Sequence, residues 1–324
     1  MVGNVSKKKS GIGILAMFLL VVVITVFVHK SIIVLGNNQT YEIENNDELH
    51  QISLPVESYF SVSISTEELN SSNAILVRLK DNTVLMQKNS EEKIYPASLT
   101  KMMTAIVAIE NLPDLNEKVR ITKSMIAGLY EADASMAGFL PGEEVRAIDL
   151  LYGAMLPSGA ECSIALAHHI AGSEQNFVNL MNLKAKDLGL KNTHFANVTG
   201  LHNENHYTTV KDLAVLLSNA LQNDIFREIF TSFRYSTPPT NMHPGGITFY
   251  STMYERLGDQ NIINGKILGG KTGYTDEAGL CLASLAKVGN LEYILITAGA
   301  KGDHLSKQYN IIDALAVYNS IIKQ

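Results

Sequence analysis

The chain has 324 residues, of which 46% are hydrophobic and 18% charged, and its formal net charge at pH 7 is −6. This composition excludes a disordered, fibrous or disulfide-scaffolded protein. The acidic balance also argues against a nucleic-acid partner, because such proteins cluster positive charge on one surface. The two cysteines, Cys162 and Cys281, are expected to be separate core residues, and whether they pair is left open.

The N-terminus predicts where the protein resides. Lysines at positions 7–9 precede a strongly apolar run over residues 11–28, which is just long enough to cross a bilayer as a helix. No small-x-small cleavage site follows, so we expect a retained transmembrane signal anchor, with a cleaved signal peptide as the alternative. The lysines place residues 1–10 in the cytoplasm. We therefore expect a single-pass protein of the cell membrane, with an extracytoplasmic linker over residues 29–72 and a catalytic domain over residues 73–324.

The domain is expected to begin with a β-hairpin. Two runs of strand-forming residues, 74–79 and 83–87, flank an Asp-Asn turn signal. The chain is then broken by Pro96. Residues 98–111 carry apolar side chains at helical spacing and predict a helix with one wide buried face.

A helical middle and a strand-rich end follow. Periodicity and helix-end signals predict helices over residues 148–155, 162–170, 177–188 and 211–221. Three strands and a closing helix are predicted over residues 266–273, 280–287, 293–300 and 303–322. This order favours an α/β (α+β) fold, in which both chain ends build one sheet and a helical subdomain is inserted between them.

The first motif that suggests chemistry is Ser-Leu-Thr-Lys at residues 98–101, at the start of a predicted helix. Residues three apart share a helix face, so the Lys101 amine can reach the Ser98 hydroxyl. A desolvated lysine with a lowered pKa can take the proton of a serine and make it nucleophilic. The unpaired N–H groups of a helix start can also support an oxyanion. The same spacing recurs in less suitable places, at Ser6, Ser284 and Ser320.

The second motif is Lys271-Thr272-Gly273, on a predicted strand. Because Gly273 has no side chain, a peptide can lie along the strand edge and pair with its backbone. Lys271 supplies a positive charge for a carboxylate, and Thr272 supplies a hydroxyl donor. Alone, the tripeptide is also compatible with an ordinary turn.

The third motif is Ser158-Gly159-Ala160, between two predicted helices. The Ser158 hydroxyl can join a proton path between Ser98 and Lys101. Alone, this motif would be interpreted as a helix N-cap.

In this order and separation, the three motifs resemble the S-x-x-K, S-D-N and K-T-G signature of class A β-lactamases and penicillin-binding proteins. Longer segments resemble the low-molecular-weight penicillin-binding proteins of the serine-type D-alanyl-D-alanine carboxypeptidase family, over residues 95–105, 150–167, 194–202, 270–275 and 278–279. The resemblance implies a β-lactamase/D,D-peptidase-like fold with an antiparallel sheet flanked by helices. It also implies removal of the terminal D-alanine of peptidoglycan stem peptides through an acyl-serine, without a cofactor and with β-lactams as inhibitors.

The resemblance further assigns roles to individual residues. Ser98 is the acylated nucleophile, Lys101 its general base, and Ser158 a proton shuttle. Substrate is bound along the strand by Lys271, Thr272, Gly273 and Tyr274. Of these, Lys271 and Thr272 hold the terminal carboxylate, and the backbone N–H groups of Ser98 and Tyr274 form the oxyanion hole.

Two features depart from the family. The third residue of the middle motif is usually Asn and here is Ala160. A methyl group neither donates to a substrate carbonyl nor accepts from a lysine, so we expect a loss of about 1–3 kcal/mol unless Glu161 or a water substitutes. Many relatives also continue into a C-terminal β domain with a membrane helix, whereas the sequence ends at Gln324. The expected N-terminal anchor would replace that tether, as in compact forms that accompany some glycopeptide-resistance systems.

Several alternatives remain at this stage. Histidines are frequent, but neither H-E-x-x-H nor a zinc spacing occurs, so no metal site is expected. A tethered β-lactamase would need a deacylating glutamate in an E-x-x-L-N stretch, and none lies between Ser158 and Lys271. A catalytically weakened penicillin-binding sensor is the third possibility, because of Ala160.

Overall fold

The computed structural model describes residues 60–323. The expected anchor at residues 11–28, and the linker up to residue 59, lie outside the described residues. Between residues 60 and 323, none of the helices combines the length and hydropathy that crossing a bilayer requires.

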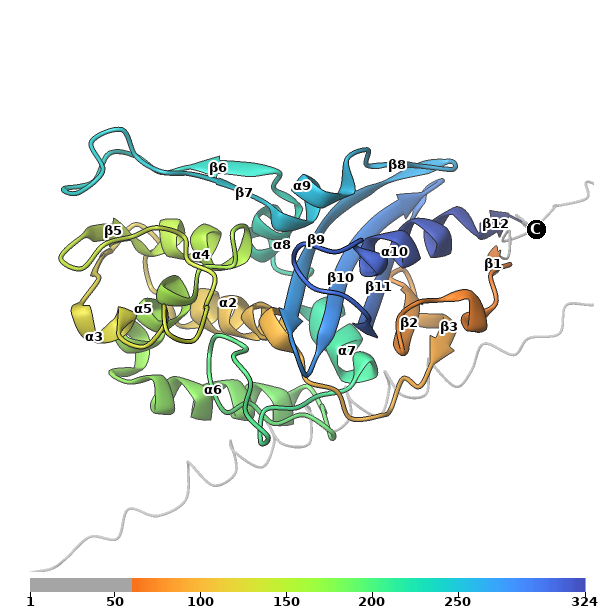
Figure 1. The fold of residues 1–324 in the computed structure, drawn as a ribbon, viewed down its shortest axis with the longest axis horizontal. Helices are drawn as coiled ribbons and strands as arrows, with labels where there is room; N and C mark the ends of the chain where they lie inside the picture. Colours follow the sequence, from red (N-terminus) through yellow and green to blue (C-terminus); the bar gives the residue numbers. More distant parts are fainter. Residues whose placement is uncertain (1–59, 324) are drawn as a thin grey trace, which may run out of the picture. The chain divides into compact units, whose positions relative to one another are not determined.

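A six-stranded antiparallel sheet takes its strands from both ends of the described chain (Figure 1). Its order is β3-β2-β11-β10-β9-β8. The strands are β2 (Asn73–Arg78), β3 (Thr83–Lys88), β8 (Asn261–Ile262), β9 (Gly265–Thr275), β10 (Gly279–Val288) and β11 (Leu291–Ala300). The predicted hairpin, the three C-terminal strands and their common sheet are thus confirmed. Because β8 pairs only with residues 265–266 of β9, the rest of β9 is an edge of this sheet among the described residues.

The two faces of the sheet contribute to two hydrophobic cores. Alternate residues of a strand point to opposite faces, and β11 shows this clearly. Ile294 and Ile296 pack with α2 (Thr100–Asn111) and α7 (Val210–Ala220), while Tyr293 and Leu295 pack with α10 (Tyr309–Asn319). Each such buried side chain contributes about 1.5–3 kcal/mol. The helices therefore fix the sheet from both sides.

The inserted helical subdomain was also predicted. It contains α3 (Lys123–Ile126), α4 (Ala147–Met155), α5 (Ala160–Ala171) and α6 (Glu174–Asp187), with a two-stranded ribbon of β4 (Lys118–Arg120) and β5 (Glu144–Arg146). The starts of α6 and α7 carry N-caps, in which Ser173 and Thr209 accept hydrogen bonds from backbone N–H groups. These caps explain why the helices begin where they do.

Helix α2 differs from its prediction. Residues Thr100 to Ile109 are all buried, so the helix is enclosed on every side rather than along one face. A central position between the sheet and α4, α5, α6 and α7 requires this. The preceding residues form a single 3-10 turn, η2 (Ala97–Leu99), so the α-helix begins two residues after Ser98.

Several short elements were not predicted, because their periodic segments are too brief to give a signal. Among them are η1 (Thr66–Glu68), α8 (Asp224–Thr231), the β6–β7 hairpin (Arg234–Ser236 and Thr248–Tyr250), α9 (Thr252–Leu257), and β12 (Ile321–Lys323), which forms a ribbon with β1 (Phe60–Val62). The closing helix is shorter than predicted. Residues 303–308 precede α10 as a loop in which Asp303 accepts backbone N–H bonds, and β12 follows it.

Candidate active site

The structure brings together the two ends of the first motif. The Lys101 amine lies 3.0 Å from the Ser98 hydroxyl oxygen and also donates to the Thr199 carbonyl at 2.6 Å. Ser98 stands in the turn η2, and Lys101 in the first turn of α2. The Thr199 carbonyl therefore orients the amine toward the serine.

The environment of Lys101 favours its neutral form. Its side chain is buried, and burial lowers the pKa of the amine to about 7, although the Glu161 carboxylate acts in the opposite direction. A neutral amine has the free electron pair that is needed to take the proton of Ser98. The pair can thus generate a serine nucleophile near neutral pH.

The turn that carries Ser98 is packed against two glycines. A methyl group on Gly200, whose φ is +84°, would lie 1.9 Å from the Ala97 carbonyl oxygen. A methyl group on Gly273 would lie 3.1 Å from the Ser98 backbone nitrogen. The absence of a side chain at position 273 therefore helps strand β9 to approach the nucleophile closely.

The third motif lies beside the second. Lys271 donates to the Ser158 hydroxyl at 2.9 Å and to the Thr272 carbonyl at 2.8 Å. Burial, followed by the nearby charge of Lys101, lowers the pKa of Lys271 well below its ordinary value. Ser158 has φ +71°, an uncommon backbone conformation that clusters at functional sites.

These residues surround a pocket of about 310 Å³. Five of the seven predicted site residues line it, namely Ser98, Ser158, Thr272, Gly273 and Tyr274. Lys101 and Lys271 lie behind the serines that they contact. The open edge of β9 forms one wall, where an extended peptide can add as a further strand.

Comparison with known proteins identifies the family. A profile described as D-alanyl-D-alanine carboxypeptidase, peptidase S11, matches residues 60–302. The D-alanyl-D-alanine carboxypeptidase DacF of Bacillus subtilis (strain 168) is 39% identical over 232 residues, which are 70% of this chain and 57% of that protein. DacC of Escherichia coli (strain K12) is 34% identical over 249 residues, 71% of this chain and 57% of that protein. The chain belongs to the peptidase S11 family.

Solved structures of this family share the fold. The crystal structure of the Streptomyces K15 DD-transpeptidase has a TM-score of 0.69 and 28% identity, covering 79% of this chain and 98% of that one. A D-alanyl-D-alanine carboxypeptidase from Mycobacterium tuberculosis H37Rv has a TM-score of 0.68 and 26% identity, covering 80% and 92%. The chain spans a little more than half the length of the curated relatives DacF and DacC.

Arg256 is a pocket residue that none of the three sequence motifs contains. It lines the pocket from α9, close to Thr252 and Thr272, whose hydroxyl oxygens lie 2.7 Å apart. Its guanidinium contacts the side chains of Gln308 and His304 at 3.0 and 3.2 Å. A guanidinium binds a carboxylate through two parallel hydrogen bonds. A carboxylate that enters the pocket would thus meet a cation in the pocket itself, in addition to the buried Lys271.

The structure also shows what surrounds Ala160. Its backbone N–H donates to the Ser135 carbonyl at 2.8 Å, and its methyl group is buried. Glu161 does not replace the missing amide, because its Oε1 accepts from Ala137 and Gly138 N–H groups at 2.7 and 2.9 Å, and Oε2 is buried without a partner. Desolvation raises the pKa of Glu161. Through these two hydrogen bonds, Glu161 instead holds the loop that contains Ser135 against helix α5.

Other sequence predictions can be compared with the described residues. Ser284 lies on β10 and bonds to Tyr318 and the Leu295 carbonyl, so it is structural. Cys162 and Cys281 are both buried and free. Between residues 60 and 323, no group of three or more His, Cys, Asp or Glu side chains is arranged to hold a metal ion.

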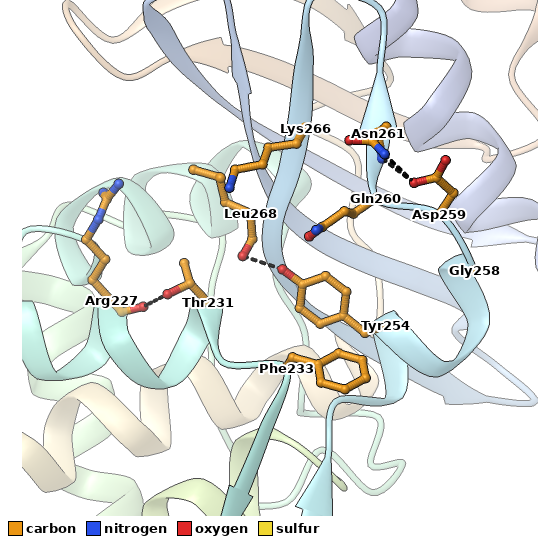
Figure 2. Close-up of a pocket in the computed structure, with 10 residues that line it drawn as sticks. All are labelled: Arg227, Thr231, Phe233, Tyr254, Gly258, Asp259, Gln260, Asn261, Lys266 and Leu268. Carbon is orange, nitrogen blue, oxygen red and sulfur yellow. Dashed lines mark hydrogen bonds between the residues drawn. The ribbon is translucent and has the colours of Figure 1, made fainter.

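A larger pocket, of about 630 Å³, contains none of the predicted site residues. Figure 2 shows that Tyr254 donates to the Leu268 carbonyl there, with the Phe233 ring beside it. Thr252 and Arg256 of α9 line the active-site pocket, whereas Tyr254 lines this one. The convergence of Ser98, Lys101 and the β9 edge, rather than size, makes the smaller pocket the candidate active site.

Proposed function

We propose that the protein is a serine-type D-Ala-D-Ala carboxypeptidase that removes the terminal D-alanine of peptidoglycan stem peptides. The observation that carries the proposal is the 3.0 Å contact between the enclosed Lys101 amine and Ser98, on a pocket bordered by the edge of β9. A family of D-alanyl-D-alanine carboxypeptidases provides the reaction class.

The proposed reaction has two steps. Lys101 takes the proton of Ser98, whose oxygen attacks the carbonyl carbon of the penultimate D-alanine. The backbone N–H groups of Ser98 and Tyr274 stabilise the oxyanion. Ser158 then relays the proton held by Lys101 to the amine of the leaving D-alanine, as the bond between that amine and the carbonyl carbon breaks. Lys101, neutral again, takes a proton from a water whose oxygen attacks the acyl carbonyl, and the proton returns to Ser98 as the acyl group leaves. Thr272, with Arg256 and the charge of Lys271, holds the terminal carboxylate, while Gly273 allows the substrate to lie against β9.

The test is D-alanine release from a pentapeptide that ends in D-Ala-D-Ala, using the full-length chain in detergent with Ser98→Ala as the control. We expect the parent chain to release D-alanine and the Ser98→Ala control to release none. EDTA should leave the release by the parent chain undiminished. Rapid turnover of penicillin without D-alanine release would favour a β-lactamase. A stable penicillin adduct without D-alanine release would favour a sensor.

We also propose that residues 11–28 anchor the chain in the cell membrane, with the active site outside the cytoplasm. The apolar run and the preceding lysines support this. Retention in the membrane pellet after alkaline carbonate extraction is the expected result, and release into the supernatant would contradict it.

A role in glycopeptide resistance is a further part of the proposal. Removal of the last D-alanine would remove the D-Ala-D-Ala end to which a glycopeptide binds. Expression of the chain in a susceptible bacterium is expected to raise the inhibitory concentration of a glycopeptide, whereas Ser98→Ala is expected to leave it unchanged. If the parent chain and Ser98→Ala raise the inhibitory concentration equally, this role is contradicted.

A further inference from the structure

The residue before the nucleophile has an unusual backbone conformation. Ala97 has φ +45°, in the left-handed region that alanine rarely adopts. Such a conformation persists only where the surroundings impose it. Because Ala97 directly precedes Ser98, its conformation sets the path by which the backbone enters the nucleophile.

A chain of side-chain hydrogen bonds ends on this residue. The Thr100 hydroxyl donates to the Ala97 carbonyl at 2.8 Å. The same hydroxyl oxygen lies 2.7 Å from Nε2 of His206. Thr100 and His206 are both buried, so neither exchanges these partners for water.

The contacts of Nδ1, the second ring nitrogen of His206, determine which atom donates in each hydrogen bond of this chain. Nδ1 of His206 faces the backbone N–H groups of Ala196 and Asn197, at 3.0 and 3.3 Å. An N–H group can only donate, so Nδ1 must accept and the proton must sit on Nε2. Nε2 therefore donates to Thr100, which in turn donates to Ala97. Burial lowers the pKa of His206 to about 4, which is consistent with a neutral ring.

We propose that His206 is a positioning residue for the nucleophile, acting through Thr100 on the carbonyl of Ala97. The neutral imidazole orders the Thr100 hydroxyl in the one direction that holds the left-handed turn. The turn then presents Ser98 to Lys101. This role in the reaction rests on the proposed function, whereas the hydrogen-bond chain is independent of it.

The first test compares two substitutions of Thr100 in the full-length chain. Thr100→Val keeps the shape and removes the hydroxyl, whereas Thr100→Ser keeps the hydroxyl. We expect acylation by a fluorescent penicillin at saturating drug to slow roughly tenfold in Thr100→Val, and to stay within about threefold of the parent in Thr100→Ser. Equal rates in the two variants, at matched thermal stability, would overturn the proposal.

The second test asks whether His206 acts through Thr100. Gln at position 206 can still donate toward Thr100, whereas Asn is too short. We expect His206→Asn to slow acylation more than His206→Gln. The double variant Thr100→Val, His206→Asn should be no slower than the slower single variant, because both changes break one chain. If the double variant slows acylation by the product of the two single factors, the two residues act independently and the proposal is overturned.

The third test does not depend on activity. In protein labelled with ¹⁵N-histidine, the His206 signals are identified by their loss in His206→Gln. They are expected to show a proton on Nε2 and a bare Nδ1 at pH 7. A proton on Nδ1 would overturn the hydrogen-bond chain. A parent protein that is not acylated but shows the expected tautomer would count against the proposed function and leave the chain of bonds in place.

Discussion

Lys271 lies 2.9 Å from the hydroxyl of Ser158, just as Lys101 lies 3.0 Å from that of Ser98. Each serine of the site thus has a buried lysine of its own. Burial lowers the pKa of both amines, and the charge of Lys101 lowers that of Lys271 further. Repulsion between the two amines disfavours protonation of both at once, so a proton that Lys101 takes from Ser98 is readily passed on.

The pH dependence of acylation should report Lys101. Its pKa is lowered to about 7, and only the neutral amine can accept the Ser98 proton. Below pH 7 the neutral fraction falls, so we expect the acylation rate to fall about tenfold per pH unit. Above pH 7 it should level off. Stopped-flow acylation between pH 5 and pH 9 checks this, and a flat profile would exclude Lys101 as the base.

Glu161→Gln provides the matched control for that profile. The amide oxygen of Gln can still accept from the N–H groups of Ala137 and Gly138, but the negative charge is gone. Because the Glu161 charge raises the pKa of Lys101, its removal should lower that pKa. The acid limb should therefore move to lower pH. A shift to higher pH would contradict the assigned charges.

Arg256→Gln should weaken recognition of the substrate carboxylate. We expect kcat/KM for a peptide ending in D-Ala-D-Ala to fall about 10- to 100-fold, since a charge-assisted hydrogen bond contributes about 1.5–3 kcal/mol. The same peptide with a C-terminal amide lacks the carboxylate, so Arg256→Gln should change its kcat/KM only a little. Equal losses on both peptides would show that Arg256 acts on the fold of the pocket instead.

Gly200→Ala should disturb the nucleophile turn, because its new methyl group would lie 1.9 Å from the Ala97 carbonyl oxygen. Gly172→Ala is the control, since Gly172 also has positive φ but has open space around it. Positive φ alone costs about 1–2 kcal/mol. We expect Gly172→Ala to lose only that much stability, while Gly200→Ala loses more and also loses acylation. Thermal unfolding and penicillin labelling of both variants check this.

Ala160→Asn should raise the turnover of the D-Ala-D-Ala peptide. The amide restores a donor for the substrate carbonyl and an acceptor for a lysine, and one such bond is worth up to about tenfold in rate. Steady-state kinetics against the parent chain checks this. A lower turnover would mean that Ser135 and the loop around it leave no room for the longer side chain.

The sequence predicted those parts of the fold and site that depend on local spacing. The i, i+3 relation of Ser98 and Lys101, the strand that carries Lys271 to Gly273, and the sheet made from both chain ends all follow from periodicity over several residues. The enclosure of α2 was missed, because burial on all sides depends on neighbours that are distant in the sequence.

The parts that escaped prediction come from short or irregular segments. Arg256 lies on a helix of six residues, and Thr199 contributes only a backbone carbonyl, which no residue type reveals. His206 belongs to no motif, because neither H-E-x-x-H nor a zinc spacing includes it. Its burial and its bond to Thr100 arise only when the loop before α7 folds against α2.

The most direct measurement is to locate the penicillin adduct by mass spectrometry of the digested full-length protein after brief exposure to the drug. The account predicts one adduct, on the peptide that contains Ser98, which persists for minutes and is absent in Ser98→Ala. An adduct on Ser158 or another serine, or none in a folded protein, would contradict the assignment of Ser98 as the nucleophile.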